Sequence, residues 1–180
     1  MKNLMKVLLV LGLGTFFACE GPPGPPGLDG RDGLDGINIL GEVFEEENIN
    51  FNAANGFRSD FYEFNPPMEP SDKLLAFILW DVVDGTDVWR ALPQTNFDFQ
   101  EGIFSYTYYF TRFGFSFAME GNFNLGILPP EYTSNQIFRV VIFPADFASS
   151  NARVNLDDYD AVMEMLNKSE SDVVKLQPKK

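Results

Sequence analysis

The chain has 180 residues with 13 basic and 26 acidic side chains, a formal net charge of −13, no histidine and one cysteine. The missing histidine excludes Ser-His-Asp triads, histidine bases and the usual zinc sites, and the lone cysteine excludes an intramolecular disulfide. The acidic balance also argues against nucleic acid as a partner, because like charges repel.

Residues 1–18 have the pattern of a secretory signal peptide. Lys2 and Lys6 form a positively charged start. The apolar run that follows, residues 7–18, is too short to span a bilayer comfortably. The run leads into Phe16-Phe17-Ala18-Cys19, which resembles the bacterial lipobox, although phenylalanine stands where leucine is most common. The resemblance implies that Cys19 is lipidated and that residues 19–20 form the lipidated N-terminus of the mature chain. Attached acyl chains would hold it on a membrane.

Residues 21–38 predict a stalk. Between Gly21 and Asn38 the chain is built of six triplets, with glycine at positions 21, 24, 27, 30, 33 and 36. Glycine at every third residue is what a collagen triple helix requires, because no other residue fits at the crowded axis. We expect a homotrimer held together by this segment and by the domain that follows. A monomeric polyproline-like spacer is the alternative.

Residues 39–180 are long enough for one domain with its own core, and their pattern is that of a mainly β domain. Aromatic and β-branched residues alternate with polar ones, and turn residues interrupt them about every ten positions, which indicates an antiparallel β-sandwich or jelly roll. Asp84-Gly85-Thr86-Asp87 predicts a tight hairpin turn. The expected strands cover residues 39–45, 57–64, 73–83, 88–92, 103–112, 115–119 and 137–143, of which 73–83 is apolar on both faces and therefore central.

The end of the chain predicts a short helix over residues 156–167. Asn155 or Asp157 can cap it, and Val162, Met165 and Leu166 recur at helical spacing. Residues 169–176 are expected to add a further helical turn or two.

The stalk, the stretches 39–45 and 135–147 and the ending 157–166 resemble a group of small collagen-repeat lipoproteins of the Bacteroidetes type, over nearly the whole mature chain. This resemblance implies a place in the cell envelope, at the outer membrane, but no activity. The layout of stalk and aromatic head is also similar to complement C1q-type proteins, as an architectural analogy only: residues 97–104 loosely resemble one patch of their signature, and the rest of the chain does not follow it.

With histidine absent, few residues remain as candidates for metal binding, ligand binding or catalysis. Acidic turns suit calcium, so Asp84 with Asp87, and Asp157 with Asp158 and Asp160, are candidate ligands of Ca²⁺. Trp89 and Tyr109 are the aromatic residues most expected at the surface, where they could stack on a sugar. Glu45-Glu46-Glu47 is interpreted as a solvated strand end.

The sequence therefore predicts a lipid-anchored envelope protein that presents a non-enzymatic interaction or structural head, with an unknown protein or glycan as its ligand. The alternatives are a carbohydrate-binding module and a small carboxylate-based glycoside hydrolase, whose two acids would flank one bond.

The trimer hypothesis has a direct test, which is the mass in solution of the ectodomain from Glu20 onward, with and without residues 21–38. We expect a trimer for the longer form. A trimer that needs the stalk would show that the repeat assembles the chains, whereas a monomer in both forms would contradict the hypothesis.

Overall fold

Two β-sheets form the domain in a computed structural model that describes residues 41–145, 147 and 153–176. The signal peptide, Cys19 and the stalk predicted above lie outside the described residues. The strands are β1 (Glu42–Ile49), β2 (Tyr62–Glu63), β3 (Asp72–Val83), β4 (Thr86–Ala91), β5 (Gln94–Asn96), β6 (Phe104–Thr111), β7 (Gly114–Gly121), β8 (Gln136–Pro144) and β9 (Val173–Lys175). The helices are α2 (Pro130–Thr133) and α4 (Tyr159–Met165), with 3₁₀ turns η2 (Ala53–Asn55), η3 (Leu125–Ile127) and η4 (Glu170–Asp172).

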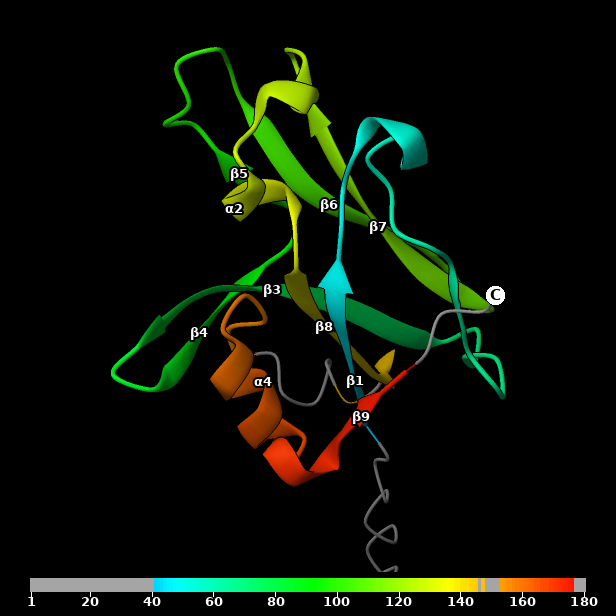
Figure 1. Cartoon of the computed structure of the whole chain (residues 1–180). Helices are drawn as coiled ribbons and strands as arrows, with labels where there is room; N and C mark the ends of the chain where they lie inside the picture. Colours follow the sequence, from blue (N-terminus) through cyan, green and yellow to red (C-terminus); the bar gives the residue numbers. More distant parts are fainter. Residues whose placement is uncertain (1–40, 146, 148–152, 177–180) are drawn as a thin grey trace, which may run out of the picture. The chain divides into compact units, whose positions relative to one another are not determined.

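The first sheet has the order β4-β3-β8-β1-β9, and the second has the order β2-β7-β6-β5. All neighbours are antiparallel except β1 and β9, which are parallel. Figure 1 shows α4 on one side of the five-stranded sheet and the β6–β7 hairpin on the other. The predicted β-sandwich with a short C-terminal helix is confirmed.

The core between the sheets is mainly aromatic. Phe117 of β7 stacks on Phe138 of β8, with ring centroids 4.2 Å apart, and neither side chain reaches solvent. Tyr106 of β6 also contacts Phe138, and its hydroxyl donates to the carbonyl of Tyr132 over 2.7 Å. Side chains that alternate along β3, β6, β7 and β8 fill this space because every second residue of a strand faces the same side.

The opposite face of the five-stranded sheet carries a second, smaller core. Val43, Phe77 and Val141 pack there against Tyr159 and Val162 of α4. Both faces of β3 are thus covered over its first half, as its apolar pattern predicted. α4 is capped by Asp158, whose carboxylate accepts from the N–H of Ala161 over 3.2 Å.

Most predicted strands are confirmed, and the hairpin turn is too. Asp84 and Gly85 have φ values of 51° and 79°, the left-handed pair that a two-residue type I′ turn needs. Within the described ranges, no helix combines the length and the apolar character that crossing a bilayer requires.

Two predictions about the elements are confirmed only in part, and one is wrong. Residues 57–64 pair with β7 only through the two-residue strand β2 and an isolated bridge at Arg58, because the register shifts by one residue between the pairs Arg58–Ala118 and Tyr62–Phe115. The further helical turn expected in residues 169–176 is confirmed as η4, but the residues after it form strand β9, because the free edge of β1 accepts a parallel partner. The cap of α4 is Asp158, whereas Asn155 receives the N–H of Asp157.

Replacing Phe138 with alanine removes the ring at the centre of the larger core. We expect the free energy of unfolding to fall by about 3–5 kcal/mol, because the lost contacts leave a cavity. Phe97→Ala is the matched control, since 72% of this phenylalanine is exposed and its loss should change stability by less than about 0.5 kcal/mol. Urea titrations of both variants check this, and equal losses would contradict the described core.

Candidate functional site

The acidic run Glu45-Glu46-Glu47 on β1 is not a solvated strand end, which corrects the sequence interpretation. Glu45 is 8% exposed and Glu46 is 2% exposed, while Glu47 is open to solvent. Because successive side chains of a strand point to opposite faces, Glu45 and Glu47 lie on the α4 side of the sheet and Glu46 lies on the inner side. One run of acids therefore serves two different environments.

On the α4 side, Glu45 is held by Arg139, its register partner on β8. The Nε and Nη2 atoms of Arg139 lie 2.8 and 2.7 Å from Oε2 of Glu45. The same guanidinium donates to both oxygens of Glu170 over 2.7 and 2.6 Å, and to the hydroxyl of Tyr159 over 2.6 Å. Only 4% of Arg139 is exposed, so its charge is neutralised inside the protein.

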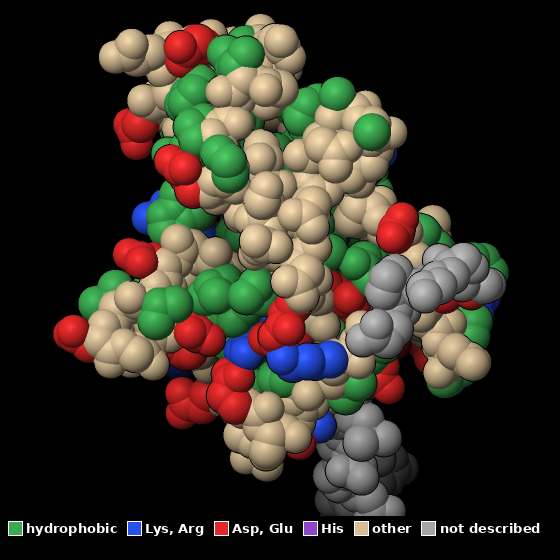
Figure 2. All heavy atoms as spheres, viewed as in Figure 1, with side chains coloured by type: hydrophobic (Ala, Val, Ile, Leu, Met, Phe, Trp, Pro, Cys, Tyr) green, Lys and Arg blue, Asp and Glu red, His purple; other side chains and the backbone are tan. Residues whose placement is uncertain are grey.

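Lys175 of β9 closes this network at the surface. Its Nζ atom lies 3.3 Å from Oε1 of Glu45, and it also donates to the carboxylate of Glu47. The hydrogen bond with Lys175 holds the pKa of Glu47 below its ordinary value. Figure 2 shows basic side chains gathered beside acidic ones on the face viewed in Figure 1, where acidic side chains are otherwise scattered.

On the inner side, one carboxyl oxygen of Glu46 is left without a partner in the described part of the chain. Its Oε1 atom is buried and makes no hydrogen bond among the described residues. Burial, and then the charge of neighbouring Glu45, raise the pKa of Glu46 to about 8. The carboxyl group is thus mostly protonated at neutral pH and can donate a hydrogen bond as well as accept one.

A β-bulge follows this carboxyl, beside an opening in the surface that Glu46 helps to line. The pairing of β1 with β8 shifts register between Glu46 and Ile49, and Asn48 takes a φ of 58°. Bulges redirect side chains and end regular pairing, and they are frequent beside functional sites. Asn50 continues the chain away from the sheet and donates to the carbonyl of Asn48 over 2.7 Å.

We call this opening the Glu46 cleft. It has a volume of about 470 Å³, within the range of small-molecule sites. Its lining comes from β1, from the segment around Arg58 and from β9, and comprises Glu45, Glu46, Glu47, Asn48, Ile49, Asn50, Asn55, Arg58, Ser59, Asp60, Tyr62, Lys175 and Leu176.

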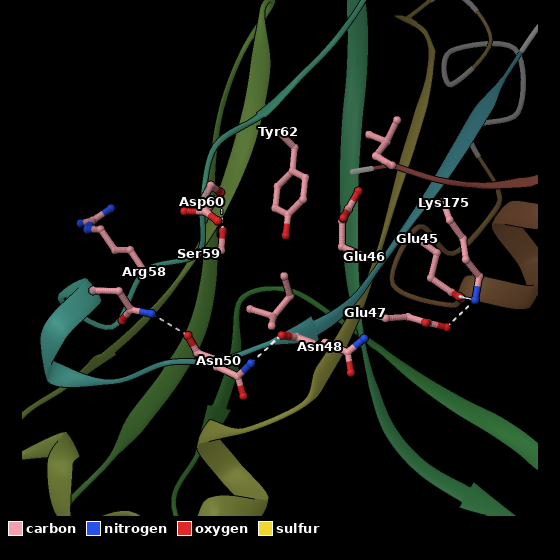
Figure 3. A pocket seen from close by; sticks show the side chains of 13 residues that line it. Glu45, Glu46, Glu47, Asn48, Asn50, Arg58, Ser59, Asp60, Tyr62 and Lys175 are labelled. Carbon is pink, nitrogen blue, oxygen red and sulfur yellow. Dashed lines mark hydrogen bonds and ion pairs between the residues drawn. The ribbon is translucent and has the colours of Figure 1, made fainter. Parts of the chain in front are cut away.

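Tyr62 stands opposite Glu46 in this cleft (Figure 3). Its ring stacks on Phe115, with centroids 5.3 Å apart, and 4% of the residue is exposed. Burial and the charges of Glu46 and Asp60 raise the pKa of the Tyr62 hydroxyl, which places both acids near the phenol. The cleft therefore presents a protonated carboxyl, an exposed carboxylate and a phenol to any occupant.

The predicted calcium ligands lie elsewhere. Asp84 is in the β3–β4 turn, whereas Asp87 lines a hollow of about 440 Å³ together with Asp157, Asp158 and Asp160. All are exposed. Within residues 41–145, 147 and 153–176, no three acidic, histidine or cysteine side chains converge in a way that could hold a metal ion.

The two aromatic candidates have different outcomes. Tyr109 on β6 is 44% exposed, as expected, and its hydroxyl donates to Glu120 while Arg58 lies 4.7 Å from its ring centre. Trp89 on β4 is only half-buried at the edge of the smaller core, with the guanidinium of Arg139 4.2 Å from its ring centre. Neither lines the Glu46 cleft.

Sequence reasoning missed Glu46 because three consecutive acids resemble a solvated segment. The available signal was Arg139, the one charged residue in an otherwise apolar strand, which requires a buried acid as its partner. No family model, curated protein or solved structure matches this chain.

The pH dependence of stability tests the state of Glu46. Because folding raises its pKa from 4.5 to about 8, the folded form holds this proton more tightly than the unfolded chain does. The resulting stabilisation is complete below pH 4.5 and is lost as the pH rises to about 8, with a slope of about 1.4 kcal/mol per pH unit.

Glu46→Gln removes the titrating group, so the difference in unfolding free energy between wild type and variant should follow that slope from pH 5 to pH 8. Urea titrations at four pH values measure it. Glu101→Gln, at an exposed loop position, should instead run parallel to the wild type. Identical slopes for wild type and Glu46→Gln would show that Glu46 has an ordinary pKa.

Proposed function

We propose that this chain is a lipid-anchored envelope protein whose β-sandwich head binds a polar ligand in the Glu46 cleft. The signal peptide pattern, Cys19 and the Gly-x-y stalk support the anchoring and the display. The binding role is carried by one observation, the buried Oε1 of Glu46 that has no partner within the described part of the chain. An unmatched buried polar atom costs about 1–3 kcal/mol, and a ligand that completes its hydrogen bonding would recover that energy.

The surroundings of the cleft suit a binding role because its walls are already fixed. Asn52 caps η2, and Asn55 of the same turn donates to the carbonyl of Asn50 over 2.7 Å. Ser59 accepts the N–H of Phe117 over 2.9 Å, which ties the segment before β2 to the second sheet. A preformed site loses less entropy when a ligand binds.

A second candidate function is glycoside hydrolysis, and the pKa of Glu46 favours it. A protonated acid near pH 7 is what a general acid requires, and Asp60 would be the ionised partner across the cleft. Asp60, however, is exposed and hydrated at the rim, whereas a catalytic carboxylate gains strength from a site that excludes water. Binding is therefore the function that we favour.

Anchoring is tested by Cys19→Ser. The variant should lose incorporation of labelled palmitate and should leave the membrane fraction, because no acyl chain can be attached to serine in this way. Ala18→Ser changes the neighbouring small residue and should keep both properties. Labelling of the serine variant at the wild-type level would contradict the anchor.

Binding is tested with the full chain in mild detergent by two-dimensional NMR, with neutral oligosaccharides and small organic ammonium ions as probes. Shift changes confined to the residues lining the cleft are expected for at least one probe class, and Glu46→Leu should abolish them because leucine cannot hydrogen-bond to a polar ligand. Probes that leave these signals unchanged would contradict the binding role. Cleavage of an oligosaccharide by the wild type and not by Glu46→Gln would instead establish hydrolysis.

A further inference from the structure

Some charged side chains around the Glu46 cleft have a partner of opposite charge, and others do not. Lys175 is paired with Glu45 and Glu47, and the guanidinium of Arg58 lies over the ring of Tyr109 rather than on an acid. Glu46 and Asp60 have no ion pair among the described residues. Of the four acids that line the cleft, Glu46 and Asp60, which border the phenol of Tyr62, are therefore the two without an ion pair among the described residues.

These two acids come from segments of different sheets and lie on either side of Tyr62. Glu46 is carried by β1 of the first sheet, and Asp60 comes two residues before Tyr62 of β2 in the second. Figure 3 shows Glu46 on one side of Tyr62 and Asp60 on the other, while Glu45 and Glu47 point toward Lys175. Both acids act electrostatically on the same hydroxyl and line the same cleft, so the phenol lies near both of them.

We propose that the ligand of the cleft is a small organic cation whose ammonium group lies between Glu46, Asp60 and the hydroxyl of Tyr62. This inference rests on the proposed binding function of the cleft and names its ligand class. An ammonium group has three donors and no acceptor, which matches two carboxylates and a phenol oxygen. The volume of about 470 Å³ leaves room for the carbon skeleton that carries it.

The depth of the two acids orients such a ligand. Glu46 is 2% exposed and Asp60 is exposed at the rim, so the ammonium group enters first and the rest of the ligand points outward. Buried Oε1 of Glu46 then gains the partner that it lacks. A neutral hydroxyl could satisfy this oxygen, but it would leave the negative charge of Asp60 unpaired.

Binding of this kind is linked to a proton, because Glu46 must ionise to pair with the cation. The charged and titratable groups that face it are Glu45 and Glu47 of its own strand, Arg58 and Asp60 of the preceding segment, Tyr62 of β2 and Lys175 of β9. Glu46 is the group among them whose pKa lies near 8. The affinity for a cation of constant charge should therefore rise roughly fifty-fold between pH 6 and pH 8 and then level off.

The test uses the full chain in mild detergent with butylammonium, which stays charged over this range, and 1-butanol as its neutral counterpart. NMR titrations at pH 6, 7 and 8 should give tightening affinity for butylammonium and no saturable binding of 1-butanol. Glu46→Gln should remove the pH dependence and weaken binding at pH 8 by about tenfold or more. Asp60→Asn should weaken binding but keep the pH dependence.

Glu101→Gln is the control variant and should bind as the wild type does. Melting curves establish that each variant is folded, and Asp60→Asn, at an exposed position, provides the test even where Glu46→Gln unfolds. Affinity for butylammonium that ignores pH would overturn the inference. Neutral oligosaccharides that bind in the cleft while butylammonium does not would overturn it and leave the binding function standing, and the failure of both probes would overturn both.

Discussion

The buried ion pair between Arg139 and Glu45 is the interaction on which the rest of the head depends. It joins neighbouring strands β8 and β1, and the same guanidinium reaches Glu170 of η4 and Tyr159 of α4. Helix α4 and turn η4 are thereby held by charge, as well as by apolar contact, to the outer face of the five-stranded sheet, which is the face that α4 covers. Such a pair stabilises the fold little more than apolar residues would. Removing one partner, however, leaves a buried charge unpaired and lowers the free energy of unfolding by about 3–5 kcal/mol. The ion pair therefore specifies which segment covers this face.

This arrangement determines the chemistry of the adjacent residue. Since Glu45 pairs with Arg139 on the outer face, the alternation of the strand directs Glu46 to the inner face, where its Oε1 atom has no hydrogen-bond partner among the described residues. The negative charge of Glu45 and the burial of Glu46 then act in the same direction and keep the second acid protonated at neutral pH. The bulge that follows opens the end of the sheet beside it. The cleft is thus a consequence of how one ion pair is placed, rather than an independent feature.

Local patterns predicted the elements whose form depends on neighbours in sequence. The two apolar faces of β3, the aromatic alternation of β6 and the Asp84-Gly85 turn could all be recognised without the fold. β9 could not, because its three residues become a strand only beside β1. The burial of Glu45 and Glu46 could not either, since Glu45 depends on Arg139, 94 residues away, and Glu46 on the second sheet, which covers the opposite face of β1. The site was missed where charge, burial and distant pairing had to be considered together.

The stalk and the cleft have different proposed roles, display and binding, and their combination affects how strongly the protein binds. A single ammonium group between two carboxylates, one of them hydrated, forms a weak contact, because solvent screens the exposed acid. If the Gly-x-y segment assembles three chains, as the sequence predicts, three clefts are joined by one stalk. Once one cleft has bound an ammonium group displayed on a surface, binding of the next cleft to that surface becomes intramolecular. Linked sites of this kind gain avidity of about 10²–10⁴ without any new contact, provided that their spacing matches the surface. Weak, pH-dependent binding in each cleft would then be sufficient to attach the trimer to such a surface, and the weakness of each contact would keep the attachment reversible.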